Sequence, residues 1–263
     1  MGLPTPPGLQ LITDLSPADW IVQRLRPWRP GGGARLESFL PDTFESYVRV
    51  LHPASSNRFG GEELTWADLA DPRGVRVGPA TSFREASGLD PSEQSWDELA
   101  PMDGSLPESK FRALKDVLAQ ATSTPEVCWF CIWAGYGFWR PSSSATLTAV
   151  RGKDTDRTTP LRPKAPTPRA SDDMRDIPQV RTFAREYFLF AGGLADQTFQ
   201  FGIWYQSPNI WWPEDHAWCV ATEIDGFSTY VGGNRDCVSK VLAASSLEAV
   251  EVDLEVRMDP GPY

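Results

Sequence analysis

Three carboxylates in the C-terminal half of the chain could do chemistry together. Glu223 and Asp225 lie two residues apart, and Asp215 precedes them closely. Neighbouring carboxylates can split their pKa values and act as acid and base, or they can bind a hard cation. Asp215, Glu223 and Asp225 are therefore the candidate catalytic residues. The same residues fit an alternative in which a strand end enters solvent beside an arginine such as Arg185 or Arg235.

An aromatic and acidic stretch around these carboxylates favours binding instead of catalysis. Aromatic side chains held on rigid loops are a common way for proteins to build recognition patches. The patch would suit a protein partner, a planar ligand or a sugar, and the alternative is that the rings only pack in a core. The candidate binding residues are Trp204, Tyr205, Trp211, Trp212, Glu214, Asp215 and His216.

Cys128-x-x-Cys131 has the spacing of metal and redox motifs, but its context indicates buried structural thiols. On a strand the two side chains point to opposite faces, and zinc would need two more ligands at workable spacing. The chain has two histidines, His52 and His216, and it contains no G-x-S-x-G, P-loop or G-x-G-x-x-G motif. We therefore expect no cofactor and no bound metal.

The composition predicts a folded protein that stays in the cytoplasm. The chain has 263 residues, of which 41% are hydrophobic, so it can bury a sizeable core. Its net charge of −10 argues against a nucleic-acid partner, whereas a basic protein partner is easier to accommodate. No cationic leader and no run of membrane-spanning length is visible, so we expect no membrane partner.

The element expected to position the candidate residues is a strand over 127–134, within a stretch rich in aromatic residues. Side chains alternate along a strand, so Trp129 and Cys131 would face one way and Phe130 and Ile132 the other. Neither set is polar. A strand that is apolar on both faces must be covered on both, which is typical of the interior of a sheet.

Other segments predict helices and further strands around it. Apolar spacings of three and four favour a helix over 107–122, and Ser16-Pro17 is a typical opening for a helix over 18–25. Short helical turns are expected at 65–69 and 95–99, and a helix ends at Ala244. The expected strands are 43–51, 145–150, 185–191, 217–225, 228–231 and 247–256, whereas 199–212 reads as aromatic and irregular.

The whole pattern predicts one α+β domain spanning residues 1–263. We expect a central mixed or antiparallel sheet with a few covering helices. Residues 1–15 read as an irregular N-terminal segment. Residues 151–178 are rich in Pro, Thr, Arg and Asp and poor in apolar side chains, so they read as an exposed loop or a flexible insertion.

Several phrases of the chain resemble those of a group of uncharacterised actinobacterial proteins. The clearest are C-W-F-C-I-W-A-G-Y-G at 128–137 and W-W-P-E-D-H-A-W-C-V-A-T-E-I-D at 211–225. The resemblance covers most of the chain from about residue 40 and supports a single fold, and it implies no activity, cofactor or catalytic residue. The group has Arg where this chain has His216, which argues against histidine chemistry there.

Three functions remain open at this point. The first is a non-catalytic cytoplasmic protein that recognises a protein partner through the aromatic and acidic surface of 204–225, similar to immunity proteins or antitoxins in size and acidity. The second is a hydrolase or metal-dependent enzyme that uses the three carboxylates on a nucleotide or sugar. The third is a structural or virion-associated component, which would form a stable homo-oligomer.

Overall fold

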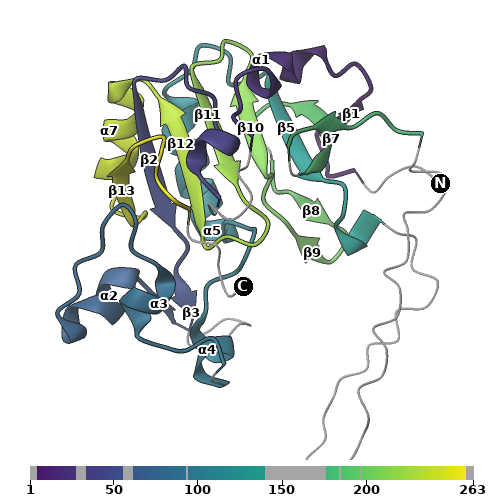
Figure 1. Ribbon diagram of the computed structural model, residues 1–263. Coiled ribbons are helices and arrows are strands. Elements are labelled where there is room, and N and C mark those ends of the chain that lie inside the picture. Colours follow the sequence, from purple (N-terminus) through teal and green to yellow (C-terminus); the bar gives the residue numbers. More distant parts are fainter. Residues whose placement is uncertain are drawn as a thin grey trace, which may run out of the picture.

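The protein has an α+β fold organised around one large antiparallel sheet (Figure 1). The computed structural model describes residues 5–27, 34–55, 62–92, 94–139, 176–183, 185–195 and 197–258. Within this part, nine strands form the sheet. Their order is β1 (Gln10–Ile12), β7 (Glu186–Gly192), β5 (Cys128–Trp133), β10 (Ile210–Pro213), β11 (Trp218–Thr222), β12 (Ser228–Gly233), β2 (Ser46–Leu51) and β13 (Ala249–Val252), with β6 (Val180–Arg181) also beside β7.

Strand β5 lies in the interior of this sheet, as its sequence predicts. It pairs with β7 on one side and with β10 on the other. Phe130 and Ile132 belong to one hydrophobic cluster, whereas Cys131 belongs to the cluster on the other face, where Trp129 and Trp133 also pack. The predicted alternation of side chains is therefore confirmed.

Two helices cover the first face of the sheet. Helix α5 (Glu108–Ala119) buries Phe111, Leu114 and Leu118, the same three- and four-residue spacing that predicts a helix here. Helix α7 (Arg235–Ala243) is capped by Asn234, whose side chain accepts a hydrogen bond from the backbone N–H of Cys237. Both helices pack on the cluster that contains Phe130 and Ile132.

Segments near both ends of the described chain cover the second face. A 3₁₀ turn, η1 (Ser16–Ala18), leads into the short helix α1 (Asp19–Val22), and η2 (Leu36–Ser38) follows. The helix expected over 18–25 is therefore shorter than predicted. Ser16 does not cap it with its side chain, because Leu15 occupies the N-cap position of the turn. Met258 closes the same face.

A third cluster lies beyond one end of the sheet, where α2 (Trp66–Ala70), η3 (Asp71–Arg73), α3 (Phe83–Ser87) and α4 (Gln94–Leu99) gather (Figure 1). Its centre is formed by Trp66, Phe83, Trp96 and Phe227, whose rings contact one another largely edge to face. A two-stranded sheet of β3 (Ala54–Ser55) and β4 (Glu63–Leu64) borders it. The helical turns predicted at 65–69 and 95–99 are confirmed.

Several predicted boundaries differ from those in the structure. Residues 1–15 are not wholly irregular, since β1 pairs with β7. Residues 199–212 contain the hairpin of β8 (Gln200–Phe201) and β9 (Trp204–Tyr205), followed by β10. The strand expected over 217–225 ends at Thr222, because Glu223 turns to bind Arg185 and the Asp225 backbone. The strand expected over 145–150 and most of the insertion at 151–178 lie outside the described residues.

In the part of the chain that the structure describes, no helix is long and apolar enough to cross a lipid bilayer.

His52 is a fully buried residue between the sheet and the third cluster. Its Nδ1 lies 2.9 Å from the carbonyl oxygen of Met102, and its Nε2 lies 2.9 Å from Oγ1 of Thr229. The first contact requires an Nδ1–H donor, so Nε2 accepts from the Thr229 hydroxyl. Burial lowers the pKa of His52 to about 4, because the charged imidazolium would lose its hydration.

This neutral histidine predicts a loss of stability in mild acid. A histidine whose pKa is lowered by folding stabilises the native state fully above its unfolded pKa, and the contribution is lost as pH falls toward the folded pKa. Between pH 7.5 and 5 the free energy of unfolding should fall by about 2 kcal/mol through His52. Urea unfolding of the wild type and of His52→Gln at both pH values measures this, and an equal acid loss in the variant would contradict it.

Candidate binding surface

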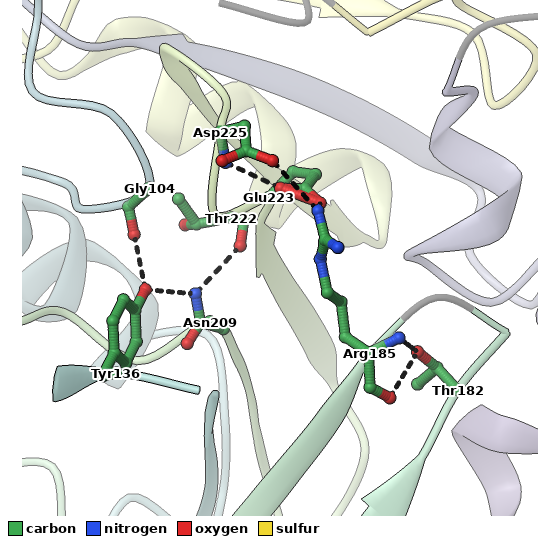
Figure 2. A network of polar contacts seen from close by, with 8 residues as sticks. All are labelled: Gly104, Tyr136, Thr182, Arg185, Asn209, Thr222, Glu223 and Asp225. Carbon is green, nitrogen blue, oxygen red and sulfur yellow. Dashed lines mark hydrogen bonds and ion pairs between the residues drawn. The ribbon is translucent and has the colours of Figure 1, made fainter. Parts of the chain in front are cut away.

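Arg185 joins the two candidate carboxylates Glu223 and Asp225 at one end of the sheet (Figure 2). Its guanidinium donates to Oε1 of Glu223 from Nε at 3.1 Å and from an Nη at 2.7 Å, and the same Nη lies 3.0 Å from Oδ2 of Asp225. The backbone N–H of Asp225 donates to the other Glu223 oxygen at 2.7 Å. Both carboxylates are thus held in an ion-pair network with Arg185.

The buried environment of Glu223 disfavours the ionised form of its carboxyl group. The residue is 7% exposed, and this burial raises its pKa, while the Asp225 N–H and Arg185 partly offset the effect. Asp225 remains open to solvent, with 47% of its side chain exposed. Arg185 pairs with both carboxylates, so a base or cation-binding role of Glu223 would compete with this ion pair.

Asp215 does not join these two residues, so the expected three-carboxylate site is not formed. It lies in the turn between β10 and β11, whereas Glu223 and Asp225 follow the other end of β11, roughly 17 Å away along the strand. Among the described residues, no group of three or more His, Cys, Asp or Glu side chains could hold a metal ion.

The carboxylate of Asp215 instead fastens a turn. It accepts hydrogen bonds from the hydroxyl of Thr122 and from the hydroxyl and backbone N–H of Ser123, all between 2.7 and 2.8 Å. Burial opposes its ionisation, but these donors and the Ala217 N–H together lower its pKa. Its oxygens are therefore used in joining the end of α5 to β10.

Trp211 and Trp212 are buried, which corrects their place in the predicted binding set. They lie in β10 at 1% and 0% exposure and point to opposite faces of the sheet. Trp211 packs on Phe130 and Trp218, and Trp212 packs on Trp20. The alternative of core packing is correct for these two rings.

Glu214 and His216 are exposed, but they lie beside Asp215 at the far end of β10. Trp129 donates its indole N–H to Oε2 of Glu214 at 2.6 Å. The imidazole of His216 stacks on Trp20 at 4.2 Å between centroids, with backbone φ at +54°. The surface expected across 204–225 is therefore split between two ends of the sheet.

The cysteines of the C-x-x-C motif face opposite sides of β5, as predicted. Cys128 and Cys131 are free thiols that belong to different hydrophobic clusters. Burial raises the pKa of Cys128 to about 12 and raises that of Cys131 as well. Neither thiol is poised for redox chemistry.

A series of aromatic rings in contact with one another begins at the end of β5. The guanidinium of Arg185 lies 6.0 Å from the Trp133 ring, which contacts Tyr136 edge to face at 5.1 Å. Tyr136 stacks on Phe138 at 5.2 Å, and Phe138 stacks on Phe201 at 4.4 Å. Trp133, Tyr136 and Phe138 are partly exposed, and we call these three rings the aromatic strip.

The β8–β9 hairpin continues this strip into solvent. Phe201 is buried at its base, while Ile203 and Trp204 at its tip are 86% and 59% exposed. Gly202 opens the two-residue turn with φ of +68°, a conformation that L residues rarely adopt. Tyr205 anchors the other strand by donating its hydroxyl to the carbonyl of Leu106 at 2.9 Å. Two large apolar side chains are thus held exposed on a fixed turn.

Asn209 connects the aromatic strip to the sheet (Figure 2). It is fully buried, and its amide donates to the Tyr136 hydroxyl at 3.0 Å and to the Thr222 carbonyl at 3.3 Å. Its side-chain oxygen accepts from the backbone N–H of Trp133 at 2.9 Å. Burial raises the pKa of Tyr136, and the charges of Glu223, Asp103 and Asp225 raise it further, so its hydroxyl stays neutral.

The sequence contained a signal for the aromatic strip. The W-A-G-Y-G-F-W run places small residues between large rings just after a buried strand, which is typical of a chain leaving a sheet. Asn209 carries no such signal, because its partners come from distant segments. The alternative in which Glu223 and Asp225 end a strand beside Arg185 is confirmed. Of the predicted binding residues, Trp204 and Tyr205 belong to this end of the sheet.

Comparison with models of known protein families, with curated proteins and with solved structures gave no match. The assignment of the chain to the actinobacterial group therefore stays a prediction.

The Arg185 network predicts a stability effect that depends on pH. Arg185→Met leaves Glu223 buried without its cation, so the free energy of unfolding at pH 7 should fall by about 2–3 kcal/mol. The loss should shrink as pH falls, because the pKa of Glu223 is already raised and the unpaired carboxyl takes up a proton. Urea unfolding at pH 7 and pH 5 measures both effects.

Arg181→Met is the matched control for this experiment. Arg181 pairs with Glu186 in the same region, but both side chains are mostly exposed, so its loss should cost less than about 1 kcal/mol. Equal losses in the two variants, or a loss in Arg185→Met that grows in acid, would contradict the assigned role of Arg185.

Proposed function

We propose that the protein is a non-catalytic cytoplasmic binding protein that recognises a protein partner through the aromatic strip and the β8–β9 hairpin. The observation that carries this proposal is the exposure of Ile203 and Trp204 side by side at the tip of an anchored turn. Tryptophan is enriched among residues that dominate binding energy, and a rigid turn lowers the entropy lost on binding.

The shape of this surface favours a macromolecular partner over a small ligand. Ile203 and Trp204 project from a hairpin, whereas small molecules bind in concave pockets. The partly exposed rings of Trp133, Tyr136 and Phe138 continue from the base of the hairpin. A partner that buries the hairpin in a pocket of its own could also contact these rings.

The charge around the strip supports a basic partner. Asp103 and Asp225 are acidic side chains beside Tyr136, and their charges act on its hydroxyl. Arg185 is the cation that faces Asp225, and Glu223 already shares it. With a net charge of −10, the protein would attract a cationic partner and steer its approach.

The contacts of the three candidate carboxylates favour the binding role over the enzyme alternative. Asp215 is used in a turn, and Glu223 and Asp225 share the single cation Arg185. A role as a structural or virion-associated component remains the third proposal, and sizing of the purified chain tests it. An immunity-like or antitoxin-like task is one form that the binding role could take.

Trp204→Ala is the direct test of the proposed surface. Loss of a central aromatic contact typically costs about 2 kcal/mol or more, so the Kd for the partner should rise about thirtyfold. The tagged full chain is used to retain proteins from a lysate of the source organism, and binding of each retained protein is then measured with wild type and variant.

Leu242→Ala is the matched control, because Leu242 is also exposed and apolar but lies on α7, away from the hairpin. It should leave the Kd unchanged. Asp103→Lys should weaken binding more at low salt than at high salt, since it reverses an exposed charge. The surface would be excluded if the retained proteins bound Trp204→Ala and Asp103→Lys, like the control, as tightly as the wild type.

A further inference from the structure

Strand β13 forms one outer edge of the sheet, and the direction of its backbone groups is fixed by its pairing with β2. The N–H of Leu51 donates to the carbonyl of Glu248 at 2.9 Å. In an antiparallel pair, residues alternate between those that exchange hydrogen bonds with the neighbour and those that point away. The backbone groups of Ala249 and Glu251 therefore point away from β2.

These outward groups are open in the described part of the chain. No backbone hydrogen bond joins the N–H or C=O groups of Ala249 or Glu251 to a described residue outside the sheet. Ala249 is partly buried and Glu251 is exposed. An edge of this kind presents alternating donors and acceptors that another extended chain can pair with.

A cleft of about 470 Å³ lies beside this edge. Ala249 and Val250 line one side, and the irregular segment Gly74, Val75, Arg76 and Val77 lines another. No isolated bridge or backbone hydrogen bond connects that segment to β13 within the described residues. The cleft therefore offers apolar side-chain contacts next to an unpaired strand edge.

The ligand chemistry follows from the backbone. A row of outward N–H and C=O groups is complemented by a polypeptide in extended conformation, which supplies the same groups in antiparallel order. Asp71, Glu248 and Arg76 line the cleft, and the exposed Glu251 and Asp253 follow along the strand and just after it. The excess of acid favours a peptide that carries Lys or Arg.

We propose that β13 binds an extended, basic peptide segment of a partner by strand addition. The peptide pairs with the backbone of Ala249, which lines the cleft beside Gly74–Val77, and with Glu251 further along the same edge. This surface is separate from the β8–β9 hairpin, which lies beyond the other strands of the sheet (Figure 1). The two surfaces have separate variants, so each proposal can fail without the other.

Ala249→Pro removes the outward donor while leaving the sheet intact. The Ala249 N–H makes no bond to β2 in this register, and proline is tolerated on edge strands where its nitrogen faces outward. Ala249→Ser is the matched control, because it keeps both the small size and the N–H. Glu251→Lys is a second variant that leaves the backbone unchanged and reverses one edge charge.

The probe is a displayed library of random peptides, selected on the full wild-type chain. We expect the enriched peptides to carry Lys or Arg. They should bind Ala249→Pro about tenfold more weakly than the wild type, and Ala249→Ser as tightly as the wild type. They should also bind Glu251→Lys more weakly than the wild type at low salt. Bound peptide should also slow hydrogen exchange at the amides of Ala249 and Glu251.

Three results would overturn the proposal. The first is that no peptide is enriched. The second is that enriched peptides bind Ala249→Pro as tightly as the wild type while that variant unfolds at the same urea concentration. The third is that the wild-type chain dimerises and Ala249→Pro is monomeric, since the edge would then pair with a second copy.

Discussion

The constraint on which the fold depends is that strand β5 is apolar on both faces. A strand of this kind has to be paired on both edges and covered on both sides, because each exposed ring would lose the favourable free energy of burial. In the structure β7 and β10 pair with its edges. Helices α5 and α7 cover one face, and segments from both ends of the described chain cover the other.

The candidate surface follows from where this buried strand ends. After Trp133 the chain leaves the sheet, and its next large rings, Tyr136 and Phe138, are partly exposed. Their position is fixed by Asn209, a fully buried amide whose hydrogen bonds reach β5, β11 and Tyr136. A buried amide with satisfied hydrogen bonds specifies one arrangement, because any shift would leave polar groups unpaired.

The sequence predicted the parts of the fold that depend on local pattern. Strand β5 and helix α5 follow from alternation and from three- and four-residue spacing, and the helix expected to end at Ala244 is α7. Strand β10 was missed because Pro208 and Pro213 read as breakers, whereas Pro213 lies at the end of the strand, opposite Cys128. The strand expected at 145–150 lies outside the described residues.

The candidate site was predicted less well, because residues that are close in sequence separate in space. Asp215 and Glu223 lie at opposite ends of β11, and Trp211 and Trp212 are taken into the core by strand pairing. Trp204 alone of the predicted tryptophans is largely exposed. Sequence spacing reports which face of a strand a residue occupies, but tertiary pairing decides whether that face meets solvent.

Native-state hydrogen exchange of the β5 amides tests the central claim most directly. If β5 is an interior strand covered on both faces, the amides of Cys128–Trp133 should exchange only through global unfolding, with an exchange free energy equal to the free energy of unfolding. Exchange through a smaller, local opening would contradict the claim, because it would mean that β5 is not enclosed by β7, β10 and the two clusters.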